Sequence, residues 1–173
     1  VEIIPSDDGN ILKIHTEKSE EFLDVFRDDT KHGYKYAHIK VTGKMNNRDF
    51  DYLSLMSLHC KSIDLRNVET TSNIACEFCG RYDLEKFIFP SSLKVIGRKN
   101  FIECYNLKEV VLPENLESIE HDSFVYCPNL ELDVPKNVKI GKDVFAGSPK
   151  VSFFRAEPAS VPEVQNDELI QKE

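Results

Sequence analysis

The stretch from Leu84 to Pro135 reads LEKFIFPSSLKVIGRKNFIECYNLKEVVLPENLESIEHDSFVYCPNLELDVP, and it matches itself when it is shifted by 23 residues. The shift places Leu84 on Leu107 and Leu107 on Leu130. Other positions that repeat at this interval are Leu93 and Leu116, Ile96 and Ile119, Phe101 and Phe124, Cys104 and Cys127, and Pro90 and Pro113. A fixed period in the twenties carried by apolar residues indicates a stack of structural repeats.

Each repeat contains a short segment in which every second residue is apolar. These pairs are Phe87 and Phe89, Val110 and Leu112, and Leu132 and Val134. Such alternation is the period of a β-strand, and the proline that follows ends the strand's hydrogen bonding. One repeat cannot close a core alone, so its neighbours above and below must bury its apolar residues. We therefore predict an α/β leucine-rich-repeat solenoid, with a parallel sheet on one face and short strands or helical turns on the other.

The same interval extends toward the N-terminus. Ile39 and Val41 lie 24 residues before Ile63 and Leu65, which lie 24 residues before Phe87 and Phe89. The solenoid is therefore predicted to occupy residues 36–155 in about five units, because the last apolar pair is at Val151 and Phe153. Residues 1–35 are predicted to form an N-terminal cap, and residues 156–173, rich in Glu and Pro, a polar tail.

Two helices are expected in the N-terminal half. In the cap, which also carries a short strand at residues 11–14, a helix begins at Ser19 and has an apolar stripe of Phe22, Val25 and Phe26. In the first solenoid unit, a helix is capped by Asn46 or Asn47 and has an inner face of Phe50, Leu53 and Met56. The helical cap would cover the apolar end of the first unit.

The net charge of −8 argues against a nucleic-acid partner and against docking on an anionic membrane. No run of 18 apolar residues is present, so no membrane insertion is expected. The sequence starts at Val1 rather than Met, and we expect a processed form whose export signal has been removed. Cys104 and Cys127, two of five cysteines, occupy repeat positions and are predicted to be buried, unpaired thiols.

The motif C-E-F-C at Cys76 and Cys79 has two interpretations. It resembles a redox pair or half of a zinc site, but a zinc site needs four ligands and no second pair at matched spacing exists. The other interpretation is two small apolar side chains beside Phe78. A disulfide between the two cysteines stays open for an exported protein.

Other candidate catalytic groups are sparse. His59 and Cys60 are adjacent, but no motif places an orienting acid beside them, and His121 and Asp122 lie in a predicted turn, where solvated side chains are the default. The sequence has no glycine-rich phosphate loop, no H-E-x-x-H and no G-x-S-x-G motif. We therefore expect no enzymatic activity, no cofactor and no metal.

The remaining candidate is the exposed face of the parallel sheet, where residues between and beside the buried pairs point outward. The central row comprises Lys40, Asp64, Ile88, Val111, Asp133 and Ser152. One flanking row comprises His38, Ser62, Lys86, Glu109, Glu131 and Lys150, with Tyr36 on the same face, and the other comprises Thr42, Arg66, Pro90, Pro113, Pro135 and Phe154. The predicted binding residues are Lys40, Asp64, Arg66, Lys86, Ile88, Glu109, Val111, Glu131, Asp133 and Phe154. Ile88 and Val111 are apolar where solvent is expected, which indicates a contact patch, although single exposed apolar residues are normal.

The pattern L-x-x-V-x-L-P, then L-x-x-I, then F-x-x-C-x-x-L resembles the BspA-type leucine-rich repeats of bacterial surface proteins. Residues 107–130, LKEVVLPENLESIEHDSFVYCPNL, follow it closely, and the resemblance covers roughly residues 36–155. Arg81 and Ser148 stand where cysteine is usual. The resemblance implies an exported, cell-surface or secreted protein that binds host or bacterial macromolecules, in some members as an adhesin, and it carries over no catalytic residues.

Two functions follow as hypotheses. The first is a non-enzymatic, adhesin-like binding module, extracellular or on the cell surface, that recognises a protein or a glycan and behaves as a monomer or a weak oligomer. The alternative is a structural or scaffold unit that acts by self-association.

Overall fold

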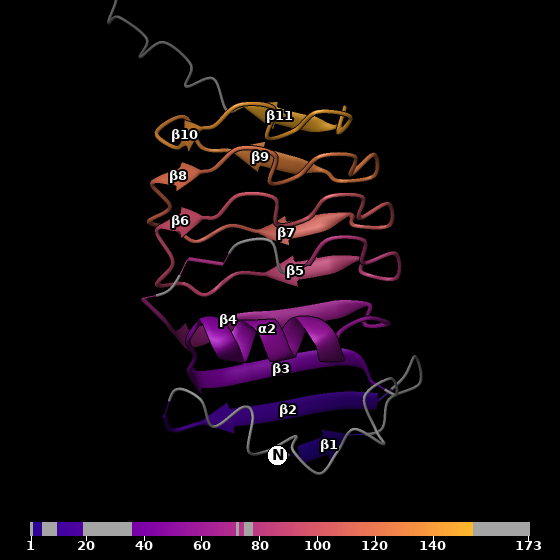
Figure 1. The fold of residues 1–173 in the computed structure, drawn as a ribbon, viewed down its shortest axis with the longest axis vertical. Coiled ribbons are helices and arrows are strands. Elements are labelled where there is room, and N and C mark those ends of the chain that lie inside the picture. The colour runs from indigo at the N-terminus through magenta and orange to yellow at the C-terminus, as the bar shows by residue number, and fades with distance from the viewer. Residues whose placement is uncertain (1, 5–9, 19–35, 72, 75–77, 154–173) are drawn as a thin grey trace, which may run out of the picture.

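The computed structural model describes residues 2–4, 10–18, 36–71, 73–74 and 78–153. These residues form a stack in which each repeat adds one level (Figure 1). The main sheet has the strand order β1-β2-β3-β4-β5-β7. Its strands are β1 (Glu2–Ile4), β2 (Asn10–Thr16), β3 (Tyr36–Lys44), β4 (Ser62–Glu69), β5 (Lys86–Ile88) and β7 (Glu109–Val111). The pair β9 (Leu132–Val134) and β11 (Val151–Phe153) continues this wall and joins it through one bridge between Glu109 and Glu131.

From β3 to β7 the register at Ile39, Ile63, Phe87 and Val110 is the one that the repeat predicts, but an irregularity after Lys40 sets Thr42 opposite Asn67 rather than Arg66. From β2 to β7 the strands are parallel, and Phe87 pairs with Ile63 on one side and with Val110 on the other. Backbone hydrogen bonds repeat with the units, since Lys108 N donates to Glu85 O at 2.9 Å and Glu131 N donates to Lys108 O at 3.0 Å. The predicted parallel sheet of equivalent strands is therefore confirmed.

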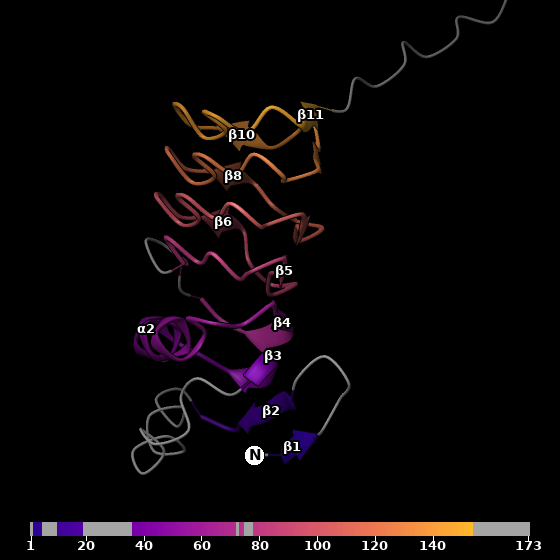
Figure 2. The same ribbon diagram turned by 90° about the vertical axis from the view of Figure 1, so that its right-hand side faces the viewer.

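A second, narrower parallel sheet forms another wall of the stack. It consists of β6 (Val95–Ile96), β8 (Ser118–Ile119) and β10 (Lys139–Ile140) (Figure 2). The turn that leads into it starts at the repeat proline, whose carbonyl accepts from Leu93 N in one unit, 3.1 Å from Pro90 O. The proline therefore ends the main strand and begins the turn. The strands β6, β8 and β10 confirm the short strands that were predicted on the other face.

The core between the two sheets is built from ladders of equivalent side chains. Phe78, Phe101, Phe124 and Phe145 stack in sequence with ring centroids 5.5, 5.2 and 5.6 Å apart. Phe87, Val110 and Leu132 all point into this core. A fully buried side chain of this size contributes roughly 1.5–3 kcal/mol, so the ladders dominate the stability of the stack.

The cysteine ladder is also confirmed. The side chains of Cys104, Cys127 and Ser148 donate to the carbonyls of Phe78, Phe101 and Phe124, respectively, at 3.1, 2.9 and 2.6 Å. Each of these bonds links one repeat to the repeat before it. Ser148 therefore replaces cysteine without loss of the bond, and the hydroxyl oxygen also accepts from Cys127 N at 2.9 Å.

Helix α2 (Asn47–Met56) packs on the core in the first solenoid unit, as predicted. Asn46 caps it, and its side chain and that of Asp49 form a reciprocal capping box. Phe50 and Leu53 are buried, and Met56 packs against the core. The predicted cap helix from Ser19 lies outside the described residues, so the N-terminal cap stays a prediction.

Arg81 occupies the repeat position where Cys104 and Cys127 stand in the next two units, and its contacts explain the difference. Its Nη2 donates to Ser54 O at 3.0 Å and to Ser54 Oγ at 2.7 Å, and its Nη1 donates to Cys79 O at 2.9 Å. The preceding unit contains a helix instead of an extended turn, and the long guanidinium side chain reaches the helix backbone.

Three details differ from the expectations. The sheet continues beyond β3 into β2 and the antiparallel β1, and Ile3 and Ile4 belong to a strand that we did not expect. Tyr36 is buried rather than exposed, because a register irregularity between Asn10 and Ile11 breaks the alternation at the start of β3. Phe153 is 56% exposed rather than buried, since β11 is the last strand of the described stack.

Candidate functional site

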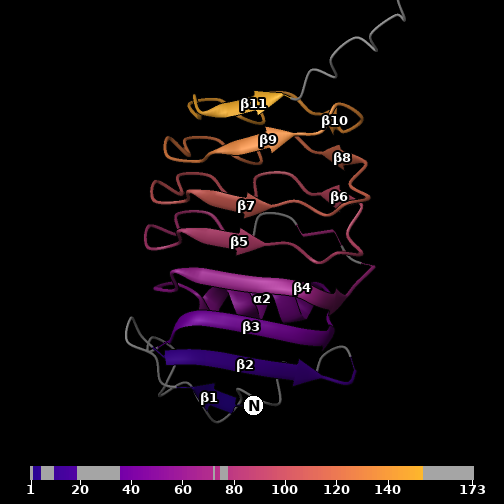
Figure 3. The ribbon, with the colours of Figure 1, turned by 180° about the vertical axis from the view of Figure 1, so that it is seen from behind.

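The exposed face of the main sheet lies toward the viewer in Figure 3. Its charged side chains form ion pairs with one another. Lys86 Nζ lies 2.7 Å from Glu109 Oε1, and Lys150 Nζ lies 3.5 Å from Glu131 Oε1. Within β4, Arg66 Nε lies 3.0 Å from Asp64 Oδ1. Asp133 Oδ1 accepts from Ser152 Oγ, and Lys40 is partly buried in the same face. Most of the predicted polar binding residues therefore form ion pairs or hydrogen bonds with other residues of the same face.

Val111 is the apolar centre of this face. Its side chain is 41% exposed, whereas Ile88, its neighbour across the ladder, is only 5% exposed. The expected exposure of Ile88 is therefore wrong. Ile88 has ladder neighbours on both sides, Asp64 and Val111, while Val111 has only Ile88, because β7 and β9 meet only at the bridge between Glu109 and Glu131. Phe154, the last predicted binding residue, lies outside the described residues.

Three open hollows lie along the second sheet rather than on the main face. Their volumes are about 830, 540 and 420 Å³, and they are lined mainly by residues 91–98, 114–122 and 137–143. The two smaller hollows share Ser92, Lys94 and Glu117, and the two larger hollows share Lys139. We call this chain of hollows the polar groove. None of its lining residues belongs to the three rows of the main face.

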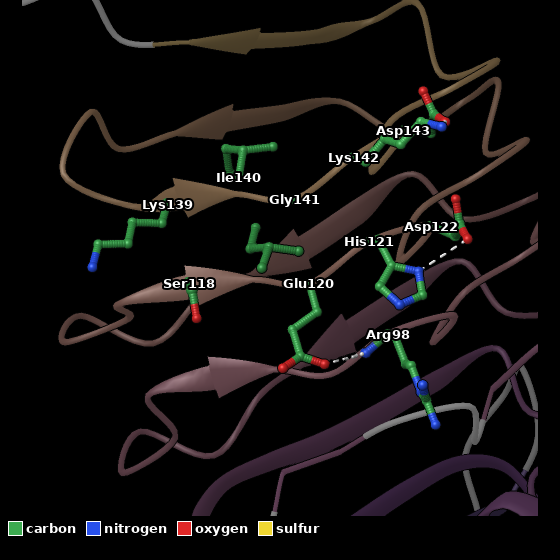
Figure 4. Close-up of a pocket in the computed structure, with 11 residues that line it drawn as sticks. Arg98, Ser118, Glu120, His121, Asp122, Lys139, Ile140, Gly141, Lys142 and Asp143 are labelled. Carbon is green, nitrogen blue, oxygen red and sulfur yellow. Dashed lines mark hydrogen bonds and ion pairs between the residues drawn. The ribbon is translucent and has the colours of Figure 1, made fainter.

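Gly141 is one of the residues that line the largest of these hollows (Figure 4). A Cβ atom on Gly141 would lie 2.6 Å from His121 N, so only glycine fits this contact between β10 and the turn after β8. Glu120 Oε2 accepts from Arg98 N at 3.2 Å, and His121 Nδ1 lies 3.1 Å from Asp122 Oδ2.

The charges of the groove balance. Arg98, Lys139 and Lys142 face Glu120, Asp122 and Asp143 around the largest hollow. In the smaller hollows, Lys94 Nζ lies 2.8 Å from Glu117 Oε1. The hydrogen bond from Lys94 lowers the pKa of Glu117 below its ordinary value, so this carboxylate is ionised at neutral pH.

Sequence reasoning missed the polar groove, although a signal was present. Ser92, Asn115 and Asn137 each precede the buried apolar residue of the turn, and Lys94, Glu117 and Lys139 each follow it. These are two polar columns with the repeat's own spacing. Exposed polar residues meet no packing requirement, so such columns alone do not predict a groove.

The structure removes the adjacent His59 and Cys60 as a nucleophile pair. His59 Nδ1 lies 2.9 Å from Asp83 Oδ2, so an orienting acid is present after all. The thiol of Cys60 is nevertheless buried, and its Sγ donates to Tyr36 O at 3.0 Å. Burial raises the pKa of Cys60 to about 12, and a thiol that stays protonated is not a nucleophile.

The C-E-F-C motif is only partly described. Cys79 Sγ donates to Lys99 O at 2.8 Å, and Cys76 lies outside the described residues. In the described part of the chain, no three His, Cys, Asp or Glu side chains converge closely enough to bind a metal ion. No helix in that part is long and apolar enough to cross a bilayer.

Comparison with known proteins agrees with the repeat geometry. The family model described as the BspA type leucine rich repeat region matches residues 43–156 in six copies. No curated protein matches the chain. The matched segment covers the helix α2, the strands from β4 to β11, and the phenylalanine and cysteine ladders. This chain therefore belongs to the BspA-type leucine-rich-repeat family.

Proposed function

We propose that this chain is a non-enzymatic binding module, on the cell surface or secreted, that recognises a protein or a glycan through the exposed face of the main sheet. Membership of a family associated with bacterial surface proteins supports the location. The exposed apolar side chain of Val111, in the middle of this face, carries the proposal.

The surroundings of Val111 suit an interface. A typical interface has an apolar centre and a polar rim, and few charges at the centre. Val111 is bordered by the neutralised pair Lys86 and Glu109, while Asp133 and Arg66 are each held by a partner within the face. The rim side chains around Val111 are thus already ordered before a partner docks, and this order lowers the entropic cost of binding.

The test is the change Val111→Arg, measured by capture on arrays of immobilised host matrix proteins and of glycans. We expect the variant to lose binding at least tenfold while its circular dichroism and unfolding curve stay unchanged. Leu55→Arg is the matched control, because Leu55 is an exposed apolar residue of α2 on another surface. If both variants bind as the parent does, the main face is not the binding surface.

The alternative is a scaffold that acts by self-association, and Phe153 favours it. This ring is more than half exposed on the last strand and contacts Phe145 edge-on at 6.0 Å, at the end of the phenylalanine ladder. Light scattering with size exclusion separates the two functions. A concentration-dependent oligomer that Phe153→Arg dissolves, without any captured ligand, would support the scaffold.

A further inference from the structure

The polar groove repeats one set of hydrogen-bonding groups at each level of the stack. Ser92, Asn115 and Asn137 form its first column, and Lys94, Glu117 and Lys139 form its second column. Lys94 and Glu117 come directly before the paired strands β6 and β8 and lie side by side, with Glu117 N donating to Lys94 O at 2.8 Å, whereas Lys139 is opposite Ser118, one residue farther along. Neighbouring strands lie about 4.8 Å apart, so the groove offers equivalent groups at that interval. One pyranose ring in an extended polysaccharide advances by a similar length.

The chemistry of the groove is that of a surface for hydroxyl groups. A serine hydroxyl and asparagine amides both donate and accept hydrogen bonds. Glu117 holds Lys94 through one oxygen, and an ionised carboxylate has about four acceptor positions, so it can receive further donors beside Lys94. Ile140, which is partly exposed at the far end of the groove, offers an apolar contact for the C–H face of a ring.

The same features disfavour other classes of polymer. A polyanion such as a sulfated glycan or nucleic acid needs a net positive surface, and the groove balances acids with bases. A protein partner needs exposed apolar anchors at the centre of its site. Leu93, Leu116 and Ile119 are buried and form the floor of the groove, and the exposed apolar residue Ile140 lies at its far end rather than at its centre.

We infer that the polar groove binds an extended neutral glycan, with sugar rings placed at successive repeats. The hollows have the volumes of ordinary ligand sites and adjoin one another, so a chain of several rings can occupy them together. This inference concerns a surface separate from the main sheet face and does not depend on the function proposed for that face.

The experiment is calorimetric titration with linear β-1,4-linked oligosaccharides of glucose, mannose and N-acetylglucosamine, from disaccharide to hexasaccharide. We expect saturable binding of at least one series, an affinity that rises with length until the groove is filled and then levels off, and little dependence on salt. Glu117→Gln should weaken binding about tenfold or more, the loss expected for one hydrogen bond to a charged group.

The matched control is Glu85→Gln. Glu85 Oε2 lies 2.8 Å from Lys108 Nζ, in the same kind of exposed ion pair between repeats, but outside the groove. This variant should bind as the parent does. The inference is overturned if no series binds saturably, if the two variants lose binding equally, or if sulfated oligosaccharides, titrated in parallel, are bound instead and salt abolishes that binding. If Val111→Arg alone removes glycan binding, the groove inference fails while the main-face proposal stands.

Discussion

Val110 and Val111 are adjacent residues of one strand, and the same substitution should destabilise the fold at Val110 and hardly at Val111. Val110 is 6% exposed and Val111 is 41% exposed, because successive side chains of β7 point to opposite faces. Val→Thr keeps the volume and replaces a methyl group with a hydroxyl. At Val110 the change loses about 0.8 kcal/mol of apolar burial and leaves a buried hydroxyl that costs about 1–3 kcal/mol without a partner. We therefore expect a loss of about 2–4 kcal/mol for Val110→Thr and less than about 0.5 kcal/mol for Val111→Thr.

The assays are urea unfolding and thermal unfolding, both followed by circular dichroism, with both variants measured beside the parent. For a domain of this size, a loss of 1 kcal/mol lowers the midpoint of thermal unfolding by about 2–4 °C, so the two variants are easily separated. Equal losses, or a larger loss for Val111→Thr, would refute the assignment of inward and outward faces on which the whole solenoid depends.

Two further substitutions test close contacts between repeats. Gly43→Ala should cost more than about 4 kcal/mol in urea unfolding, because Gly43 has φ +95° and a Cβ atom there would lie 1.9 Å from Thr16 O. Ser148→Ala should cost about 1–3 kcal/mol in the same assay, since it leaves Phe124 O and Cys127 N without the hydroxyl that pairs with both.

Each of these variants has a control at hand. Gly80 also has a positive φ, +64°, but the nearest atom to an added Cβ is Tyr82 Oη at 3.9 Å, so Gly80→Ala should cost only about 1 kcal/mol. Ser148→Cys restores the residue type of the ladder and should cost less than Ser148→Ala. If Gly43→Ala is as mild as Gly80→Ala, or Ser148→Cys as costly as Ser148→Ala, the contacts described between repeats are wrong.

The repeated core could be predicted from the sequence because its period is uninterrupted. Phe101 and Phe124, or Leu107 and Leu130, are buried for the same reason in each unit, so one correct unit determines the next. The capped helix α2 was also predictable, since Asn46 and the apolar residues that follow at helical spacing are local signals.

The features that escaped prediction are those where the repeat changes. The strand at residues 11–14 was predicted and is part of β2, but its place in the main sheet was not, because Leu12 pairs with Ile39 at an interval of 27 residues rather than 23 or 24. The burial of Ile88 depends on which neighbouring strands continue past it, which alternation alone does not show. The polar groove depends on hollows between turns, and no residue pattern encodes a hollow directly.

The most direct test of the stacked register is a cross-link between the neighbouring strands β5 and β7. Lys86 and Glu109 are Cα partners in these parallel strands, and strands about 4.8 Å apart place paired Cα atoms within the range of a disulfide. Lys86→Cys with Glu109→Cys should form a disulfide quantitatively on mild oxidation, as peptide mapping by mass spectrometry would show. Lys86→Cys with Val111→Cys, on the same face but two residues out of register, should not. A cross-link in the second pair and none in the first would contradict the solenoid described here.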